Sequence, residues 1–152
     1  MYIPKHFLNS DQDEAVVFMQ KYSFATLVTA EQNIPVATHL PFLIQKIDDR
    51  IILSSHFAKA NPQAAAIAGS DILVIFTEPH AYISPRFYER DQNVPTWNYL
   101  AVHAYGKATI IEDEAGKLAL MERTIVNYEA KYLEQWRGLS NDYKLKMLKG
   151  IV

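Results

Sequence analysis

The chain has 152 residues, 49% of them hydrophobic and 21% charged, which excludes disordered, collagenous and low-complexity proteins and predicts a single domain over residues 1–152. Fifteen Lys and Arg against 17 Asp and Glu give a net charge of -2, so no overall positive field attracts nucleic acid or an anionic membrane. Cysteine is absent, which excludes disulfides, thiolate metal sites and cysteine nucleophiles. No apolar run is long enough for a signal peptide or a bilayer span, so we expect a cytoplasmic protein without membrane contact.

The first half of the chain predicts one helix, four strands and a second, short helix. The first helix begins at Ser10, its expected N-cap, and its apolar residues recur at helical spacing: Ala15, Phe18, Met19 and Tyr22. The strands are rich in β-branched and aromatic residues and cover 23–29, 35–44, 50–55 and 71–78. Asn61 caps the short helix, which has Pro62 in its first turn and Gly69 just past its end.

The second half predicts one long strand and two helices. In the strand, 96–111, alternation places Leu100, Val102, Ala104, Ala108 and Ile110 on one face and Trp97, Tyr99, His103 and Tyr105 on the other. A long helix runs from Asp113 to about Trp136, and Ser140 begins a terminal helix. That terminal helix has three residues spaced to pack inward: Tyr143, Met147 and Leu148. Consecutive antiparallel strands with peripheral helices predict a mainly β protein of the α+β class, built as a small β-barrel with helices on its outside.

A first candidate site lies where the third strand ends, just before the short helix. Ser54, Ser55 and His56 come directly before Lys59 and the helix cap Asn61. Hydroxyl donors, a lysine charge and a helix N-terminus together favour a phosphate. A capped helix beside a solvated lysine explains the same residues, and both interpretations stay open.

Two further segments are candidates. Prolines bracket aromatic residues in 79–88 and 94–99, which predicts a stiff rim suited to a planar heterocycle or, equally, to a subunit interface. In 35–44, Pro41 predicts an edge strand or a bulge. His39 beside it is a ligand candidate or a structural histidine.

Metal binding, hydrolysis and DNA binding have weaker support. The histidines at 39, 56, 80 and 103 lack metal-ligand spacing, and no nucleophile elbow is present. The segment 117–149 could form a helix-turn-helix that carries Lys144, Lys146 and Lys149. Direct DNA contact therefore stays an alternative.

Five segments, taken in order, resemble the PaiB family of FMN-binding negative transcriptional regulators: 2–7, 37–42, 56–62, 79–85 and 94–103. The resemblance implies the FMN-binding split β-barrel, antiparallel and Greek-key-like, which is shared with pyridoxamine-phosphate oxidases. It implies a homodimer with FMN at the subunit interface and a role in repressing sporulation and degradative-enzyme genes. A flavin-dependent oxidoreductase related to those oxidases is the alternative.

The resemblance also assigns cofactor-binding residues, but no catalytic residue and no metal ligand. It places Ser54, Ser55, His56, Lys59 and Asn61 around the FMN phosphate, Thr38, His39 and Leu40 beside the ring system, and Tyr82, Ser84, Trp97, Asn98 and His103 around the rim. Thr77–Glu78 and Arg86–Phe87 depart from the usual family pattern. We further expect C-terminal helices over 115–149 to pack on the barrel, and the usual C-terminal tail of the family to be absent.

Overall fold

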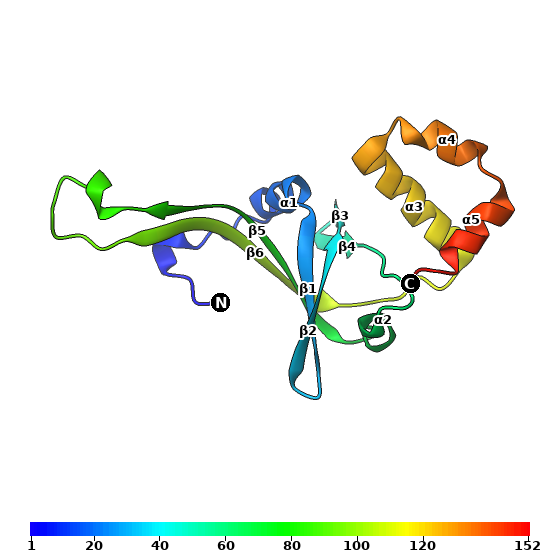
Figure 1. Ribbon diagram of the computed structural model, residues 1–152, viewed down its shortest axis with the longest axis horizontal. Coiled ribbons are helices and arrows are strands. Elements are labelled where there is room, and N and C mark those ends of the chain that lie inside the picture. Colours follow the sequence, from blue (N-terminus) through cyan, green and yellow to red (C-terminus); the bar gives the residue numbers. More distant parts are fainter.

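The computed structural model describes residues 1–152 and contains two antiparallel sheets (Figure 1). The larger sheet has the strand order β2-β1-β5-β6, and the smaller one pairs β3 with β4. The strands are β1 Phe24–Glu31, β2 Ile34–Pro41, β3 Leu43–Ile47, β4 Arg50–Ser54, β5 Asp71–Ile83 and β6 Thr96–Lys107. The helices are η1 Lys5–Phe7, α1 Gln12–Lys21, α2 Pro62–Ala66, η2 Pro85–Phe87, α3 Glu114–Glu129, α4 Tyr132–Gly138 and α5 Asn141–Leu148.

The antiparallel α+β fold class is confirmed, and the sheets do not close on themselves. The barrel therefore remains a prediction. No helix is both long and apolar enough to cross a bilayer.

The expected strand 35–44 is two strands, which meet at Phe42. The N–H of Phe42 donates to the carbonyl of Ser23 at 2.9 Å, after which the chain leaves the larger sheet and pairs with β4. Because antiparallel pairing alternates, Pro35 and Pro41 face the open side of β2, where no N–H is needed. The edge position predicted from Pro41 is confirmed.

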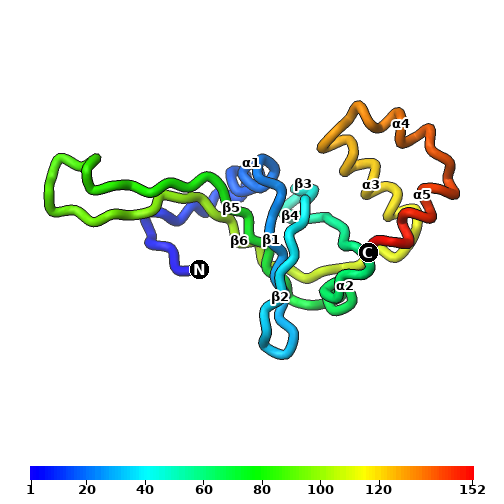
Figure 2. The backbone as a smooth tube through the Cα atoms, in the orientation of Figure 1, coloured from blue at the N-terminus to red at the C-terminus, as the bar shows by residue number.

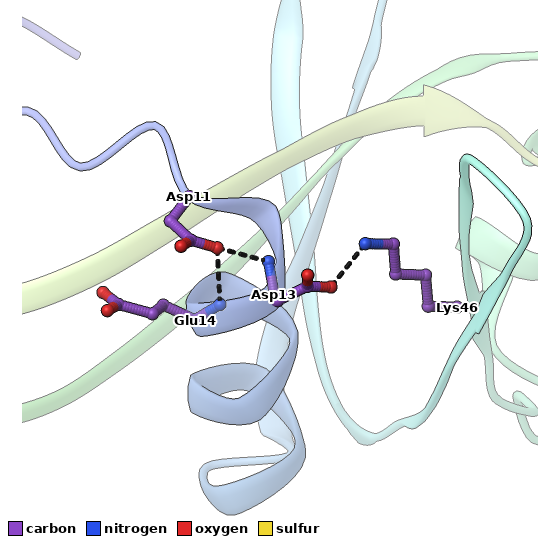
Figure 3. Close-up of polar contacts among 4 residues, drawn as sticks. All are labelled: Asp11, Asp13, Glu14 and Lys46. Carbon is purple, nitrogen blue, oxygen red and sulfur yellow. Dashed lines mark hydrogen bonds and ion pairs between the residues drawn. The ribbon is translucent and has the colours of Figure 1, made fainter.

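The first helix begins one residue later than expected. Its N-cap is Asp11, not Ser10, and the Asp11 carboxylate accepts hydrogen bonds from the N–H groups of Asp13 and Glu14 (Figure 3). A carboxylate caps well because it also interacts with the positive end of the helix. Lys46 of β3 pairs with Asp13 and joins the start of α1 to the smaller sheet.

The core lies between the inner face of the larger sheet, α1 and α2. Phe76 of β5 is 0% exposed and packs edge-on against Phe42, with ring centroids 5.8 Å apart. Val102 and Ala104 of β6 pack against this core, as their alternation predicts. Leu100 does not: it is 56% exposed, because the register shift between Thr77 and His80 carries the strands beyond the core.

Past that shift, β5 and β6 continue as a two-stranded arm, which we define as residues 80–99. Figures 1 and 2 show it extending away from the rest of the molecule. His80 pairs with Tyr99 and Tyr82 pairs with Trp97 along the arm. The fourth strand is thus longer than the expected 71–78, whereas β6 ends at Lys107 rather than at residue 111.

The expected single helix over 113–136 is two helices, α3 and α4, separated at 130–131. The terminal helix α5 begins at Asn141 rather than at Ser140, which is its N-cap: the Ser140 hydroxyl accepts from the N–H of Tyr143 at 3.3 Å. Of the three residues expected to pack inward from α5, Leu148 is buried, but Tyr143 and Met147 are exposed. In Figure 2 the chain returns from α5 to end close to α2.

Candidate functional site

The segment from Ser54 to Asn61, which we call the 54–61 segment, joins β4 to α2 and is held by the chain on two sides. Phe57 and Val152 exchange backbone hydrogen bonds of 2.8 and 3.0 Å, and the N–H of Lys59 donates to the carbonyl of Gly150 at 2.8 Å. On the other side, the Ser55 hydroxyl donates to the carbonyl of Pro41 at 2.7 Å. The backbone that carries the predicted phosphate ligands is therefore ordered before any ligand binds.

A cavity of about 870 Å³ lies beside this segment, bounded by β4, β6 and α3. Its volume is in the range of small-molecule and cofactor sites, and most of its wall is apolar. Ser54, Ser55 and His56 supply polar groups to the wall. His103 also borders the cavity, from β6.

Both histidines have imidazoles that are biased toward the neutral form. Burial lowers the pKa of His56. Burial also lowers the pKa of His103, with a smaller contribution from the N-terminal ammonium group. A neutral imidazole offers one donor and one acceptor, and Nδ1 of His103 is buried without a hydrogen-bond partner. An unpaired buried polar atom of this kind fits a ligand with hydrogen-bonding edges.

Lys59 is the cation of the segment. Its side chain is exposed, and neither of the two salt bridges in the chain uses it, since they involve Lys46 and Lys107. The dipole of α2 contributes little, because α2 has only 5 residues and the side-chain Oδ1 of Asn61 already accepts from the N–H of Gln63. Attraction of a phosphate therefore depends on Lys59 and the hydroxyl of Ser54, because the Ser55 hydroxyl already donates to the Pro41 carbonyl.

Thr38 and Asn61 lie together, but their polar atoms already have protein partners. Asn61 Nδ2 donates to Thr38 Oγ1 at 3.0 Å, and Thr38 Oγ1 donates to Gln63 Oε1 at 2.6 Å. Gln63 was not among the predicted site residues. The sequence feature that could have identified it is its position, as a polar residue directly after the predicted cap Asn61 and Pro62.

The two residues after Thr38 diverge, as neighbours on a strand must. Leu40 is buried in the core. His39 is exposed and stacks on Phe24, with ring centroids 6.3 Å apart.

The remaining predicted residues belong to the arm and its tip, and the structure does not bring them to the cavity of the same chain. Tyr82 packs edge-on against Trp97 at 6.1 Å, and Asn98 follows on the same strand. Ser84 caps η2 by accepting from the N–H of Arg86 at 3.3 Å.

The proposed DNA-contacting lysines of α5 are not equivalent. Lys144 is 8% exposed, its ammonium lies 5.4 Å from the centre of the Trp136 ring, and it donates to the carbonyl of Arg137 at 3.4 Å. Only Lys146 and Lys149 are exposed. Two lysines next to Asp142 make a weak surface for a phosphate backbone.

A family model and several curated proteins match the sequence of this chain. A family described as "Putative FMN-binding domain" matches residues 1–152. Protease synthase and sporulation protein PAI 2 of Bacillus subtilis is 46% identical over 158 residues, covering 100% of this chain and 74% of that protein. The uncharacterized protein YKL070W of Saccharomyces cerevisiae is 30% identical over 152 residues, covering 85% of this chain and 90% of that protein.

Two solved structures share the fold. The flavocytochrome Anf3 from Azotobacter vinelandii superposes with a TM-score of 0.73 at 18% identity, over 99% of this chain and 65% of that one. The FAD and heme binding protein from Mycobacterium smegmatis gives a TM-score of 0.71 at 15% identity, over 94% of this chain and 64% of that one. This chain thus spans just under two thirds of both structures.

Proposed function

Because the chain belongs to the PaiB family of FMN-binding domains, we propose that it is a homodimeric flavoprotein that acts in negative regulation of transcription. FMN is the cofactor of this family. The observation that carries the placement of the cofactor is the 54–61 segment, whose backbone is held by hydrogen bonds, whose Ser54 lines the cavity and whose Lys59 is exposed and unpaired. A phosphate needs this combination of donors and positive charge.

The residues of the chain have distinct roles toward FMN. Ser54 and Lys59 hold the phosphate, and Ser55 and His56 line the adjoining wall. His103 offers its unpaired Nδ1 to a polar edge of the ligand. Bound FMN supplies a ring that can accept and donate electrons, and the protein sets its position and surroundings.

The arm supports the proposed homodimer. Tyr82 is 53% exposed and Trp97 is 59% exposed, and both belong to a two-stranded ribbon with no third strand beside it. Such ribbons are marginally stable alone, and exposed aromatic clusters mark interaction sites. In the dimer the arm of one copy covers the flavin site of the other, which brings Tyr82, Ser84, Trp97 and Asn98 to the cofactor.

The regulatory role rests on the relative PAI 2, whose name assigns it to protease synthesis and sporulation. We propose that the flavin-bound dimer of this chain is the form that acts in gene regulation. Reading of DNA by α5 has little support, because Lys144 is buried against Trp136.

The test is the absorption spectrum of freshly purified protein, followed by titration with FMN and with riboflavin. We expect bound flavin with quenched fluorescence, and tighter binding of FMN than of riboflavin. A colourless protein that leaves FMN fluorescence unchanged would contradict flavin binding. Promoter DNA that binds with strong salt dependence would instead assign a direct DNA contact, because lysine–phosphate contacts release counterions.

Flavin-dependent oxidoreduction is the second candidate, and the fold shared with the flavocytochrome Anf3 favours it. Anaerobic mixing with NADH or NADPH tests it. Saturable bleaching of the bound flavin would establish a reductase. If the bound flavin bleaches no faster than free FMN, the reductase is ruled out and gene regulation is the remaining proposed function.

A further inference from the structure

We propose that Gln63 is a positioning residue for the flavin phosphate, because it fixes the end of the 54–61 segment to the β1–β2 hairpin. The inference rests on the proposed function, since it concerns the same phosphate. Gln63 lies in the first turn of α2 and is 4% exposed, which is rare for a glutamine unless its carboxamide is fully paired.

The carboxamide of Gln63 bonds to both strands of the hairpin. Its Nε2 donates to Thr29 Oγ1 of β1 at 2.9 Å and to the Val36 carbonyl of β2 at 3.0 Å. Its Oε1 accepts from Thr38 Oγ1 of β2 at 2.6 Å. One side chain thereby connects α2 to two neighbouring strands.

Asn61 closes this arrangement into a ring of hydrogen bonds. Its Nδ2 donates to Thr38 Oγ1 at 3.0 Å, and its Oδ1 accepts from the N–H of Gln63 at 2.9 Å. Every side-chain amide in the ring therefore has a partner, and such satisfied networks rigidify the segments that they join. Thr38 and Asn61 act on the flavin through this ring, by holding the segment in place.

The ring supplies the anchor that the end of the segment otherwise lacks. Ser55 ties the start of the segment to Pro41, and Phe57 and Lys59 pair with the residues around Val152. Beyond Lys59, Ala64 and Ile67 pack in the core, and the ring supplies the side-chain hydrogen bonds between α2 and the larger sheet. Preorganised ligands bind more tightly because less freedom is lost on binding. Riboflavin has the same ring system as FMN but no phosphate, so the anchor should matter for FMN alone.

The experiment measures the ratio of the riboflavin Kd to the FMN Kd in the full chain. Gln63→Leu keeps the side-chain size and removes every carboxamide bond. We expect the ratio to fall about tenfold, with riboflavin binding unchanged. Thr29→Val removes one partner of Gln63 without changing shape, so it should shift the ratio in the same direction by less. If Gln63→Leu does not fold, the Kd ratio of Thr29→Val tests the proposal in its place.

Gln20→Leu is the matched control, because Gln20 Nε2 also joins a helix to a strand, donating to the Ile44 carbonyl at 3.2 Å, but takes no part in the ring of hydrogen bonds. Its ratio should equal that of the wild type. Equal weakening of both flavins by folded Gln63→Leu, or an unchanged ratio, overturns the inference while the proposed function stands. A wild-type protein that binds neither flavin, or binds both equally, overturns the phosphate site and the inference together.

Discussion

The hydroxyl of Ser55 donates a hydrogen bond of 2.7 Å to the carbonyl oxygen of Pro41, where β2 ends. A serine has one hydroxyl proton, so Ser55 has none left to give to a phosphate in this arrangement. Ser54, one residue earlier, has no such bond. The two serines therefore have different roles: Ser54 donates to the ligand, and Ser55 ties the segment to the larger sheet.

Replacing Ser54 by Ala should weaken FMN binding by about 1.5–3 kcal/mol and leave riboflavin binding unchanged, because a hydrogen bond to a charged group is lost. Ser55→Ala should instead lower the free energy of unfolding by about 0.5–1.5 kcal/mol, with a smaller effect on FMN. Flavin titration and urea unfolding of both variants separate these outcomes. The opposite ranking for FMN would assign the phosphate contact to Ser55.

Lys59→Ala should weaken FMN by about 1.5–3 kcal/mol and spare riboflavin, because the lost contact is charge-assisted. Rising salt should reduce the difference between wild type and variant, since Lys59 is exposed. The control is Lys146→Ala, which removes an exposed lysine on α5. Equal loss of FMN and riboflavin in Lys59→Ala would move the phosphate to another part of the chain.

Stability should fall as the pH drops below about 6.5, the ordinary pKa of histidine. The pKa values of His56 and His103 are lowered in the folded state, so in this range the unfolded chain binds more protons and is favoured. Above that pH the two histidines are neutral in both states and add no pH dependence.

Urea unfolding of His56→Gln across that range should give a shallower loss of stability than the wild type. His6→Gln is the control, because His6 is exposed in the fold as it is in the unfolded chain. Identical pH profiles for wild type and His56→Gln would show that burial of His56 does not penalise its charge.

Trp97→Glu should convert the dimer to a monomer at micromolar concentration, because a charge replaces the largest aromatic side chain of the arm. Analytical ultracentrifugation measures the change. Tyr143→Glu changes a comparably exposed aromatic residue on α5 and should leave the dimer intact. A wild-type protein that sediments as a monomer would refute the proposed assembly.

Local features of the sequence predicted the parts of the fold that depend on local chemistry. Asn61 caps α2 as expected, because a helix cap depends only on hydrogen bonds to residues two or three positions further along the chain. Pro41 indicated an edge strand, because proline cannot donate to a neighbour. Ser10 was the wrong cap: Asp11 next to it takes this position, and its carboxylate accepts from two backbone N–H groups. Aspartate and serine are similarly good caps, so the local sequence does not choose between them.

Features that depend on distant segments were not predicted. Phe42 divides the 35–44 segment because its N–H pairs with Ser23 while the next residue pairs with β4. Tyr143 and Met147 have the spacing of inward-facing residues, yet no element packs over them. Gln63 has no motif that marks it, because its partners come from two strands earlier in the chain.

The sequence by itself determined most of the element types, the cap of α2, the family and the ordered motifs that point to FMN, since these follow from short-range chemistry and from residue identity. Only the tertiary structure decided that Ser55 and Asn61 are bonded within the protein, that Lys59 is unpaired, and that the aromatic arm lies away from its own cavity. The physical reason is that a side chain's free donors and charges depend on which distant backbone and side-chain groups the fold brings within hydrogen-bond distance.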